Sequence, residues 1–246
     1  MNIFFHLGRY FFLLWRVLRV PEKWASFRKE LVREIWDIGV SSMGIVIFIS
    51  TFVGAVVALQ LAFNIQDSPF LPNWYIGYGT RQSLVLEFSP TMISLVLAGK
   101  VGSSISSNIG TMRSSEQIDA LEVMGVNSAQ FLILPKIIAS IFFNPFLIVL
   151  SLAAGIAGGL LAGPLTGLWT ITEYIDGATL DFKPYSFTYA MIKTIIFAFV
   201  IATVSSYQGY FTKGGSLDVG KSSTQAVVYS SITIIILNFV LTQALL

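Results

Sequence analysis

The stretch from Gly99 to Gly125, GKVGSSISSNIGTMRSSEQIDALEVMG, is a polar and charged segment between long apolar runs. Of the 246 residues in the chain, 54% are apolar and only 11% are charged, whereas soluble domains carry about 25% charged residues. This deficit predicts a chain that is embedded in lipid, in which residues 99–125 meet water. At this length we expect one domain, residues 1–246.

The composition also argues against several kinds of functional site. The net charge of +2 is too small to indicate a nucleic-acid partner. The sequence has no cysteine for a disulfide, a thiolate nucleophile or a Cys-ligated metal. His6, the single histidine, cannot form a metal site or a catalytic triad alone. We therefore expect no metal, no cofactor and no catalytic residues.

Residues 1–37 combine apolar and basic side chains at helical spacing. Apolar residues, many of them aromatic, recur from Phe4 to Leu18. A separate stripe is basic and consists of Arg9, Arg16 and Arg19. This pattern predicts an interfacial amphipathic helix in the headgroup layer, ending near Pro21, although a solvated helix shows a similar charge pattern. A second amphipathic stretch, residues 24–36, leads toward the membrane.

Five further segments are apolar enough to cross a bilayer, which takes about 20 helical residues. We predict membrane spans at about 40–63, 84–106, 137–161, 185–207 and 224–244. The uncharged run from Ile137 to Thr172 would be about 54 Å long as one helix, so we expect a break at Asn144-Pro145 or Gly163-Pro164. Pro90 predicts a kink in the second span.

Small residues recur every four positions in two of these spans. One set is Ser50, Gly54 and Ala58, and the other is Gly155, Gly159 and Gly163. Small residues at this spacing let helices approach closely in lipid. We expect close helix packing here, within one chain or between two copies.

Three connections between the spans are rich in polar residues, glycine or proline, and we predict loops at 67–79, 173–183 and 211–223. Residues 215–222, GSLDVGKS, match the phosphate-loop pattern GxxxxGK[ST]. That motif needs a preceding strand and a soluble domain, and here it follows a membrane span. We therefore interpret it as a flexible turn.

The distribution of basic residues predicts the orientation of the spans. With a cytoplasmic N-terminus, twelve of the fifteen Lys and Arg residues fall on the cytoplasmic side. An excess of Lys and Arg marks cytoplasmic segments. The segment 99–125 is then cytoplasmic, and the acidic segment 173–181 is on the opposite side.

The second half of the polar segment predicts a short helix over residues 114–124. Ser114 can cap it, Gln117 can complete a capping box, and Gly125 can end it. Ile118 and Leu121 share one side, beside an acidic edge made by Glu116, Asp119 and Glu122. On spacing alone, the apolar pair fits packing on the chain's own bundle as well as docking to another protein.

Several short motifs together suggest a known family. They are Glu87-x-x-Pro90, residues 98–103 (AGKVGS), 109–113 (IGTMR) and 116–121 (EQIDAL), together with Gly54, Gln60, residues 207–210 (YQGY), 226–228 (AVV) and 239–242 (FVLT). Through these motifs, nearly the whole chain resembles the MlaE (YrbE) permease family, the membrane subunits of ABC-type transporters that move lipids together with MCE-domain proteins. Four positions depart from the family pattern: Leu86, Lys100, Asn108 and Asn238.

The resemblance implies an all-α integral membrane protein that works as a homodimer. A separate cytoplasmic ABC ATPase would dock on the helix at 114–124, and a periplasmic MCE-domain protein would lie on the far side. The residues that the resemblance places at the ATPase are Glu116, Gln117, Ile118, Asp119 and Leu121. We expect a phospholipid between the two copies, against Val53, Val57, Gln60, Leu61 and Glu87; alternatively, Glu87 is a structural partner of Arg81 or of a helix start.

The implied function is that of a non-catalytic permease subunit in the bacterial inner membrane, with multiple spans and a cytoplasmic N-terminus. It would move phospholipids or similar amphiphiles between that membrane and the MCE protein. Two alternatives are a membrane scaffold that anchors an ATPase without conducting substrate and a membrane-embedded enzyme. The intramembrane Glu87, Lys100 and Lys193 argue against the scaffold, and the missing catalytic cluster argues against the enzyme.

Overall fold

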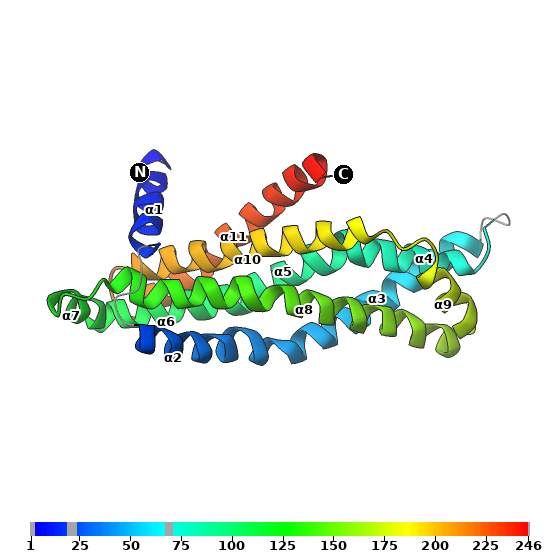
Figure 1. Cartoon of the computed structure of the whole chain (residues 1–246), viewed down its shortest axis with the longest axis horizontal. Coiled ribbons are helices and arrows are strands. Elements are labelled where there is room, and N and C mark those ends of the chain that lie inside the picture. Colours follow the sequence, from blue (N-terminus) through cyan, green and yellow to red (C-terminus); the bar gives the residue numbers. More distant parts are fainter. Residues whose placement is uncertain (1–2, 19–23, 67–70, 246) are drawn as a thin grey trace. The chain divides into compact units, whose positions relative to one another are not determined.

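The computed structural model describes residues 3–18, 24–66 and 71–245, and this part of the chain contains helices but no strand (Figure 1). The helices are α1 (Ile3–Val17), α2 (Trp24–Glu34), α3 (Met43–Gln66), α4 (Trp74–Ser83), α5 (Ile93–Leu97), α6 (Ser103–Ser114), α7 (Gln117–Val123), α8 (Ser128–Thr166), α9 (Ile171–Thr179), α10 (Pro184–Tyr210) and α11 (Ser216–Leu245). Five helical segments among the described residues are long and apolar enough to cross a membrane: 27–65, 74–114, 128–166, 184–210 and 216–245. The predicted class, an all-α integral membrane protein, is confirmed.

The helices form two compact units. The first unit comprises residues 1–41, 95–144 and 195–243, and the second comprises 42–94, 145–194 and 244–246. The α7 segment belongs to the first unit, and the small-residue stripes of α3 and α8 belong to the second.

The second span is helical without interruption from Trp74 to Ser114. Three α-helical pieces are joined by two π-helical ones, Leu84–Met92 (η3) and Ala98–Gly102 (η4). Pro90 lies inside η3. Because proline cannot donate the usual helix hydrogen bond, a π-helical turn at this position accommodates it. The helix is not broken at Pro90, and the predicted kink stays a prediction.

The predicted loop at 67–79 is wrong in its second half, because α4 begins at Trp74. Its glycines serve helix packing, since α4 lies against α9 in the second unit (Figure 1). A Cβ atom on Gly77 would lie 2.0 Å from the carbonyl oxygen of Tyr174, and one on Gly177 would lie 1.7 Å from that of Trp74. Glycine is thus required on both helices at this contact. These glycines allow the helices to touch and do not mark a turn.

The predicted break at Asn144-Pro145 is also wrong, because α8 is one helix of 39 residues. A proline inside a membrane helix is tolerated where neighbouring groups compensate for the lost hydrogen bond. At about 58 Å, α8 is longer than the hydrocarbon core, and polar side chains such as Gln130 and Lys136 occupy its first part. The second candidate, Gly163-Pro164, lies close to the actual end: Gly167, with φ +71°, follows the last helical residue.

The predicted close packing of small residues occurs between α3 and α8 of the same chain. A Cβ atom on Gly54 would lie 1.9 Å from the carbonyl oxygen of Gly155, and one on Gly158 would lie 2.0 Å from that of Thr51. The Ser50 hydroxyl donates to Ser151 Oγ at 2.8 Å. The two backbones therefore touch without intervening side chains, which fixes the position of α3 in the second unit.

Helix α1 attaches to the first unit through polar contacts and through the buried side chains of Leu13 and Val17. The Arg9 guanidinium stacks over the Phe211 ring at 3.7 Å, and Tyr10 donates a hydrogen bond of 2.7 Å to Thr203. Most of its other large apolar side chains are exposed, as is Leu18 just after the helix: Phe4, Phe5, Leu7, Phe11, Phe12 and Trp15. This exposed apolar face suits the predicted interfacial helix. Pro21, where we expected the helix to end, lies outside the described residues, and α1 itself ends at Val17.

The other two predicted loops are largely helical. In the segment 173–183, residues 173–179 belong to α9, whose N-terminus is capped by a capping box between Thr170 and Glu173. The phosphate-loop match at 215–222 falls on the start of α11, so the predicted flexible turn is wrong from Ser216 onward. The Ser222 hydroxyl donates to the Gln208 carbonyl. A regular helix holding this serine leaves no loop to wrap around a phosphate.

Candidate functional site

Helix α7, the segment predicted to contact the ATPase, begins three residues later than expected. Ser114 is the last residue of α6, and its hydroxyl donates to the Thr111 carbonyl, so the predicted Ser114 cap is wrong. The residue before α7 is Glu116, which has φ +61° and makes no side-chain cap. Gln117 donates to the Ser115 hydroxyl at 3.0 Å. The sharp turn at Glu116 separates α7 from α6.

The side chains of α7 divide into one buried anchor and an exposed surface. Ile118 is 0% exposed, so it holds α7 to the first unit and has no surface for a partner in this conformation. Leu121 is half-buried. The exposed residues of α7 and its two flanking positions are Glu116, Gln117, Asp119, Ala120, Glu122, Val123 and Met124, of which Val123 is 89% exposed. The apolar part of the exposed surface therefore comes from the end of the helix, which the spacing argument did not single out.

Asp119 already has a partner within the chain. The Arg113 guanidinium, near the end of α6, donates to Asp119 Oδ1 at 2.5 Å. Both side chains are partly exposed. Exposed ion pairs of this kind contribute about 0–1 kcal/mol. The pair therefore orients the Asp119 carboxylate but binds it only weakly. A basic group on another protein can compete with Arg113 for this carboxylate.

Glu122 joins α7 to three other helices. Its Oε1 accepts hydrogen bonds from Ser128 of α8 at 2.8 Å, from Tyr210 of α10 at 3.0 Å and from Arg16 of α1 at 3.3 Å. These bonds, first the one from Ser128, lower the pKa of the Glu122 carboxyl. Asn127 adds a bond to the Arg16 carbonyl at 3.1 Å. Sequence reasoning missed this junction because its partners are far apart in the chain.

We expect Glu122→Gln to loosen α7. Because hydrogen bonds lower its folded pKa, the carboxylate stabilises the fold fully above its unfolded pKa of about 4.5, and this contribution disappears as the pH falls through the lower folded value. Hydrogen–deuterium exchange of the α7 amides should therefore be faster in the variant than in the wild type near pH 7. The difference should vanish in strongly acidic buffer. Glu116→Gln, which alters an exposed carboxylate at the residue just before α7, serves as the control.

The second group of candidate residues is an ion pair in the second unit. Lys193 of α10 is 0% exposed and donates to Glu87 Oε1 at 2.8 Å, while the Glu87 side chain is 41% exposed. Tyr189 places its ring 4.5 Å from the Lys193 ammonium. Thr91, one turn after Glu87, donates to Oε2 at 3.2 Å. The lysine is thus neutralised from one side, and the carboxylate keeps a surface open to its surroundings.

The alternative interpretation of Glu87 as the partner of Arg81 is wrong. The Arg81 guanidinium donates instead to the carbonyl oxygens of Ala178 at 3.0 Å, Leu180 at 2.8 Å and Asp181 at 3.3 Å. It therefore satisfies the polar groups at the end of α9, where the helix leaves its carbonyls unpaired. This arginine has a structural role that its position in the sequence did not reveal.

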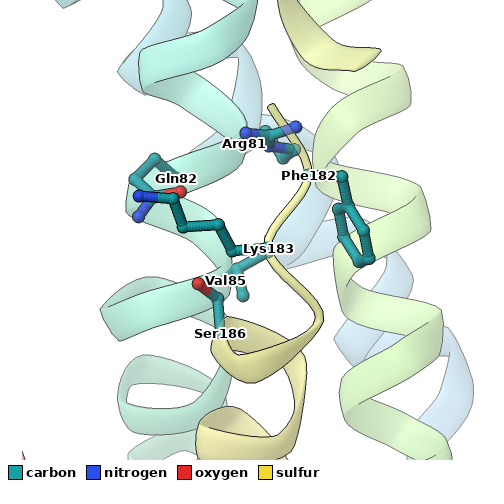
Figure 2. A pocket seen from close by; sticks show the side chains of 6 residues that line it. All are labelled: Arg81, Gln82, Val85, Phe182, Lys183 and Ser186. Atoms are coloured by element: carbon teal, nitrogen blue, oxygen red, sulfur yellow. The ribbon is translucent and has the colours of Figure 1, made fainter. Parts of the chain in front are cut away.

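A small hollow lies beside Arg81 (Figure 2). It is lined by Arg81, Gln82, Val85, Phe182, Lys183 and Ser186, and Figure 2 shows the Lys183 side chain reaching toward the side of α4 that carries Gln82. Its volume is about 10 Å³, which is the space of one water molecule. A lipid headgroup does not fit there, so the hollow adds no binding site.

The four predicted lipid contacts on α3 lie one to two turns apart in the second unit. Val57 is buried, Val53 and Leu61 are half-buried, and Gln60 is exposed. Leu61 packs beside Gly79 of α4. Their role in binding lipid remains a prediction, as does that of Glu87.

Comparison with known proteins decides the family. A family model described as "Permease MlaE" matches residues 31–244. The chain belongs to the MlaE permease family. A "Probable ABC transporter permease protein" of Rickettsia bellii is 34% identical over 213 residues, covering 87% of this chain and 82% of the relative. "Probable ABC transporter permease protein slr1045" of Synechocystis is 32% identical over 214 residues, covering 87% and 81%.

A plant relative extends the comparison to a lipid-related name. "Protein TRIGALACTOSYLDIACYLGLYCEROL 1, chloroplastic" of Arabidopsis thaliana is 35% identical over 229 residues, which cover 93% of this chain and 63% of the relative. This MlaE-family chain is therefore a multi-pass membrane permease of ABC-transporter type. It is a transport component rather than a catalytic enzyme, and an ABC permease implies an ATPase partner.

Proposed function

We propose that this permease moves phospholipids or similar amphiphiles between the bacterial inner membrane and an MCE-domain protein on its far side. It acts as a homodimer, and a separate cytoplasmic ABC ATPase drives it. The observation that carries the proposal is membership of the MlaE family over residues 31–244. The name of the Arabidopsis relative, which refers to a diacylglycerol lipid, supports a lipid as the cargo.

The exposed surface of α7 is the proposed contact with the ATPase. Glu116 and Asp119 supply negative charge for basic groups on the partner, and charge complementarity of this kind guides docking. Gln117 and Leu121 complete the predicted contact, and the exposed Val123 and Met124 extend it with apolar surface. Ile118 contributes indirectly, because its burial holds α7 to the first unit. A helix held by Ile118 and Glu122 can pass movement of the ATPase on to α1, α8 and α10.

The second unit supplies the proposed lipid contacts. An ionisable pair at membrane depth is costly unless it has a function or a partner, and Glu87 offers a half-exposed carboxylate supported by buried Lys193. We propose that Glu87 meets the polar part of the lipid, and that Val53, Val57, Gln60 and Leu61 meet its remaining surface. The cargo lies in a cavity between the two copies of the chain.

The proposed orientation places the N-terminus and α7 in the cytoplasm. It is supported by the distribution of basic residues, of which twelve of fifteen fall on that side. In this orientation α9, with Glu173 and Asp176, faces the periplasmic MCE protein. The ATPase and the MCE protein then approach the permease from opposite sides of the inner membrane.

The decisive experiment is ATP-dependent transfer of labelled phospholipid in proteoliposomes. The permease is reconstituted with its ATPase, and an MCE-domain protein is supplied on the other side as donor or acceptor. We expect transfer that requires ATP and all three components. If the complex assembles and hydrolyses ATP while lipid transfer stays at the level of protein-free vesicles, the permease is a scaffold that anchors the ATPase.

A further inference from the structure

A polar hollow in the first unit is separate from the proposed transport and coupling residues. It has a volume of about 260 Å³ and is lined by Glu34, Asp37, Ile38, Ser41, Ser104, Ile105, Asn108 and Lys136. A single water molecule needs only about 10–15 Å³ of such space, and a drug-sized ligand about 300 Å³ or more. The hollow is therefore the right size for a small polar group such as a lipid headgroup.

Two of the residues that line the hollow form a buried ion pair. Lys136 of α8 donates to a carboxylate oxygen of Glu34 of α2, and their side chains are only 6% and 7% exposed. Two charges are buried here at a cost, which their mutual contact offsets. Because Glu34 neutralises it, Lys136 does not make the hollow attractive to an anion.

The remaining polar lining consists mainly of oxygen acceptors. Ser104 and Asn108 are exposed one turn apart on α6, and the Asp37 carboxylate is 57% exposed. The only charge near Asp37 that forms an ion pair with it among the described residues is Arg33, at a long 3.8 Å. A carboxylate, two hydroxyls and an amide suit a group that donates several hydrogen bonds. A primary ammonium, with three N–H donors, meets that requirement.

The surroundings place the hollow at headgroup depth. Basic side chains occur just before it on α2, and Trp36 beside it is 65% exposed. Tryptophan and basic residues mark the membrane interface. We therefore place Asp37 and the hollow at the level of the lipid headgroups.

Two cationic side chains lie beside the lining residues. They suit the phosphate of a zwitterionic headgroup. Arg33 approaches Asp37, and the Lys100 ammonium donates to the Ser41 carbonyl oxygen and to its hydroxyl. A phosphate beside these cations and an ammonium inside the hollow have the charge order of phosphoethanolamine. The π-helical turn Ile35–Gly39 (η1) carries Asp37 to this position.

We propose that this hollow binds the phosphoethanolamine headgroup of a phospholipid in the leaflet next to α2. The ammonium enters between Asp37, Ser104 and Asn108, and the acyl chains stay in the bilayer. The site requires only the folded first unit in a membrane. Headgroup binding can therefore be tested separately from lipid transport.

The test compares two lipids that differ only in the headgroup amine. The purified protein is incubated with equal amounts of phosphatidylethanolamine and phosphatidylcholine with the same acyl chains, and native mass spectrometry measures the lipid it retains. The quaternary amine of phosphatidylcholine cannot donate a hydrogen bond, so we expect about a tenfold preference for phosphatidylethanolamine, the effect of a charged hydrogen bond. Equal retention of the two lipids would overturn the proposal.

Asp37→Asn should reduce this preference to about one, because it removes the carboxylate while keeping the side-chain shape. Asp181→Asn is the matched control: Asp181 is 63% exposed and lies 3.9 Å from Lys183, much as Asp37 lies from Arg33. The control should keep the full preference, and a preference that survives in Asp37→Asn contradicts the site. Millimolar soluble phosphoethanolamine should not displace the lipid; displacement would mean that the hollow takes the free headgroup and that the lipid assignment is wrong.

Discussion

Replacing Asp119 by arginine is expected to abolish both co-purification of the ATPase and lipid transport. Asp119 is exposed on α7, and Arg113 holds it in a weak surface ion pair. An arginine there would place a positive charge in the negative docking surface, directly opposite the basic groups that we propose on the ATPase. Like charges facing each other cost several kcal/mol at an interface. Pull-down of the ATPase and the transfer assay measure the two effects.

Two further variants separate docking from folding of α7. Arg113→Ala removes the ion pair within the chain but keeps the acidic group, so it should still bind the ATPase. The double variant Arg113→Asp/Asp119→Arg restores an opposite-charge pair in the chain but should still fail to bind. Because α7 lies between membrane spans, all three variants should insert normally. Full ATPase binding by Asp119→Arg would refute the coupling surface.

The second large effect is expected at the membrane-depth ion pair. Glu87→Leu leaves the ammonium of Lys193 buried without its carboxylate. Removing one partner of a buried pair costs about 3–5 kcal/mol, and we expect about half of that because Glu87 is 41% exposed. Thermal unfolding in detergent should therefore shift clearly downward. The double variant Glu87→Leu/Lys193→Met should recover much of the lost stability, since no unpaired charge remains.

The double variant also distinguishes a structural role of Glu87 from a role in lipid handling. If the carboxylate meets the lipid headgroup, the double variant should be stable and yet deficient in transfer. Thr91→Val removes a hydrogen bond to Glu87 while keeping both charges, so it provides a milder control. Normal transfer by the stable double variant would show that the pair serves packing alone.

Much of the fold could be predicted because its signals are local. A run of about 20 apolar residues is a property of one segment, and all five predicted spans are present. The breaks were less predictable, because glycine and proline have more than one use. Gly77 looked like a turn residue, yet it allows α4 to touch the backbone of Tyr174. Pro145 looked like a helix end, yet α8 continues through it.

The candidate sites depended more on contacts between distant segments. The acidic edge of α7 was visible as residues three apart, but the sequence could not show that Glu122 accepts hydrogen bonds from Ser128, Tyr210 and Arg16. Likewise, Glu87 and Lys193 were each recognised as ionisable groups at membrane depth, and their pairing across 106 positions was not. Such contacts are set by tertiary packing, and spacing within one helix carries no record of them.

The exposed apolar face of α1 has a practical consequence for handling the protein. Its exposed aromatic side chains, including Phe11 and Trp15, need a hydrocarbon phase once native lipid is removed. A detergent belt that covers this helix poorly will favour self-association through it or strain its attachment. Since Arg16 of the same helix contacts Glu122, such strain reaches α7. Detergent choice should thus alter ATPase binding without any change of sequence, and nanodiscs should restore it.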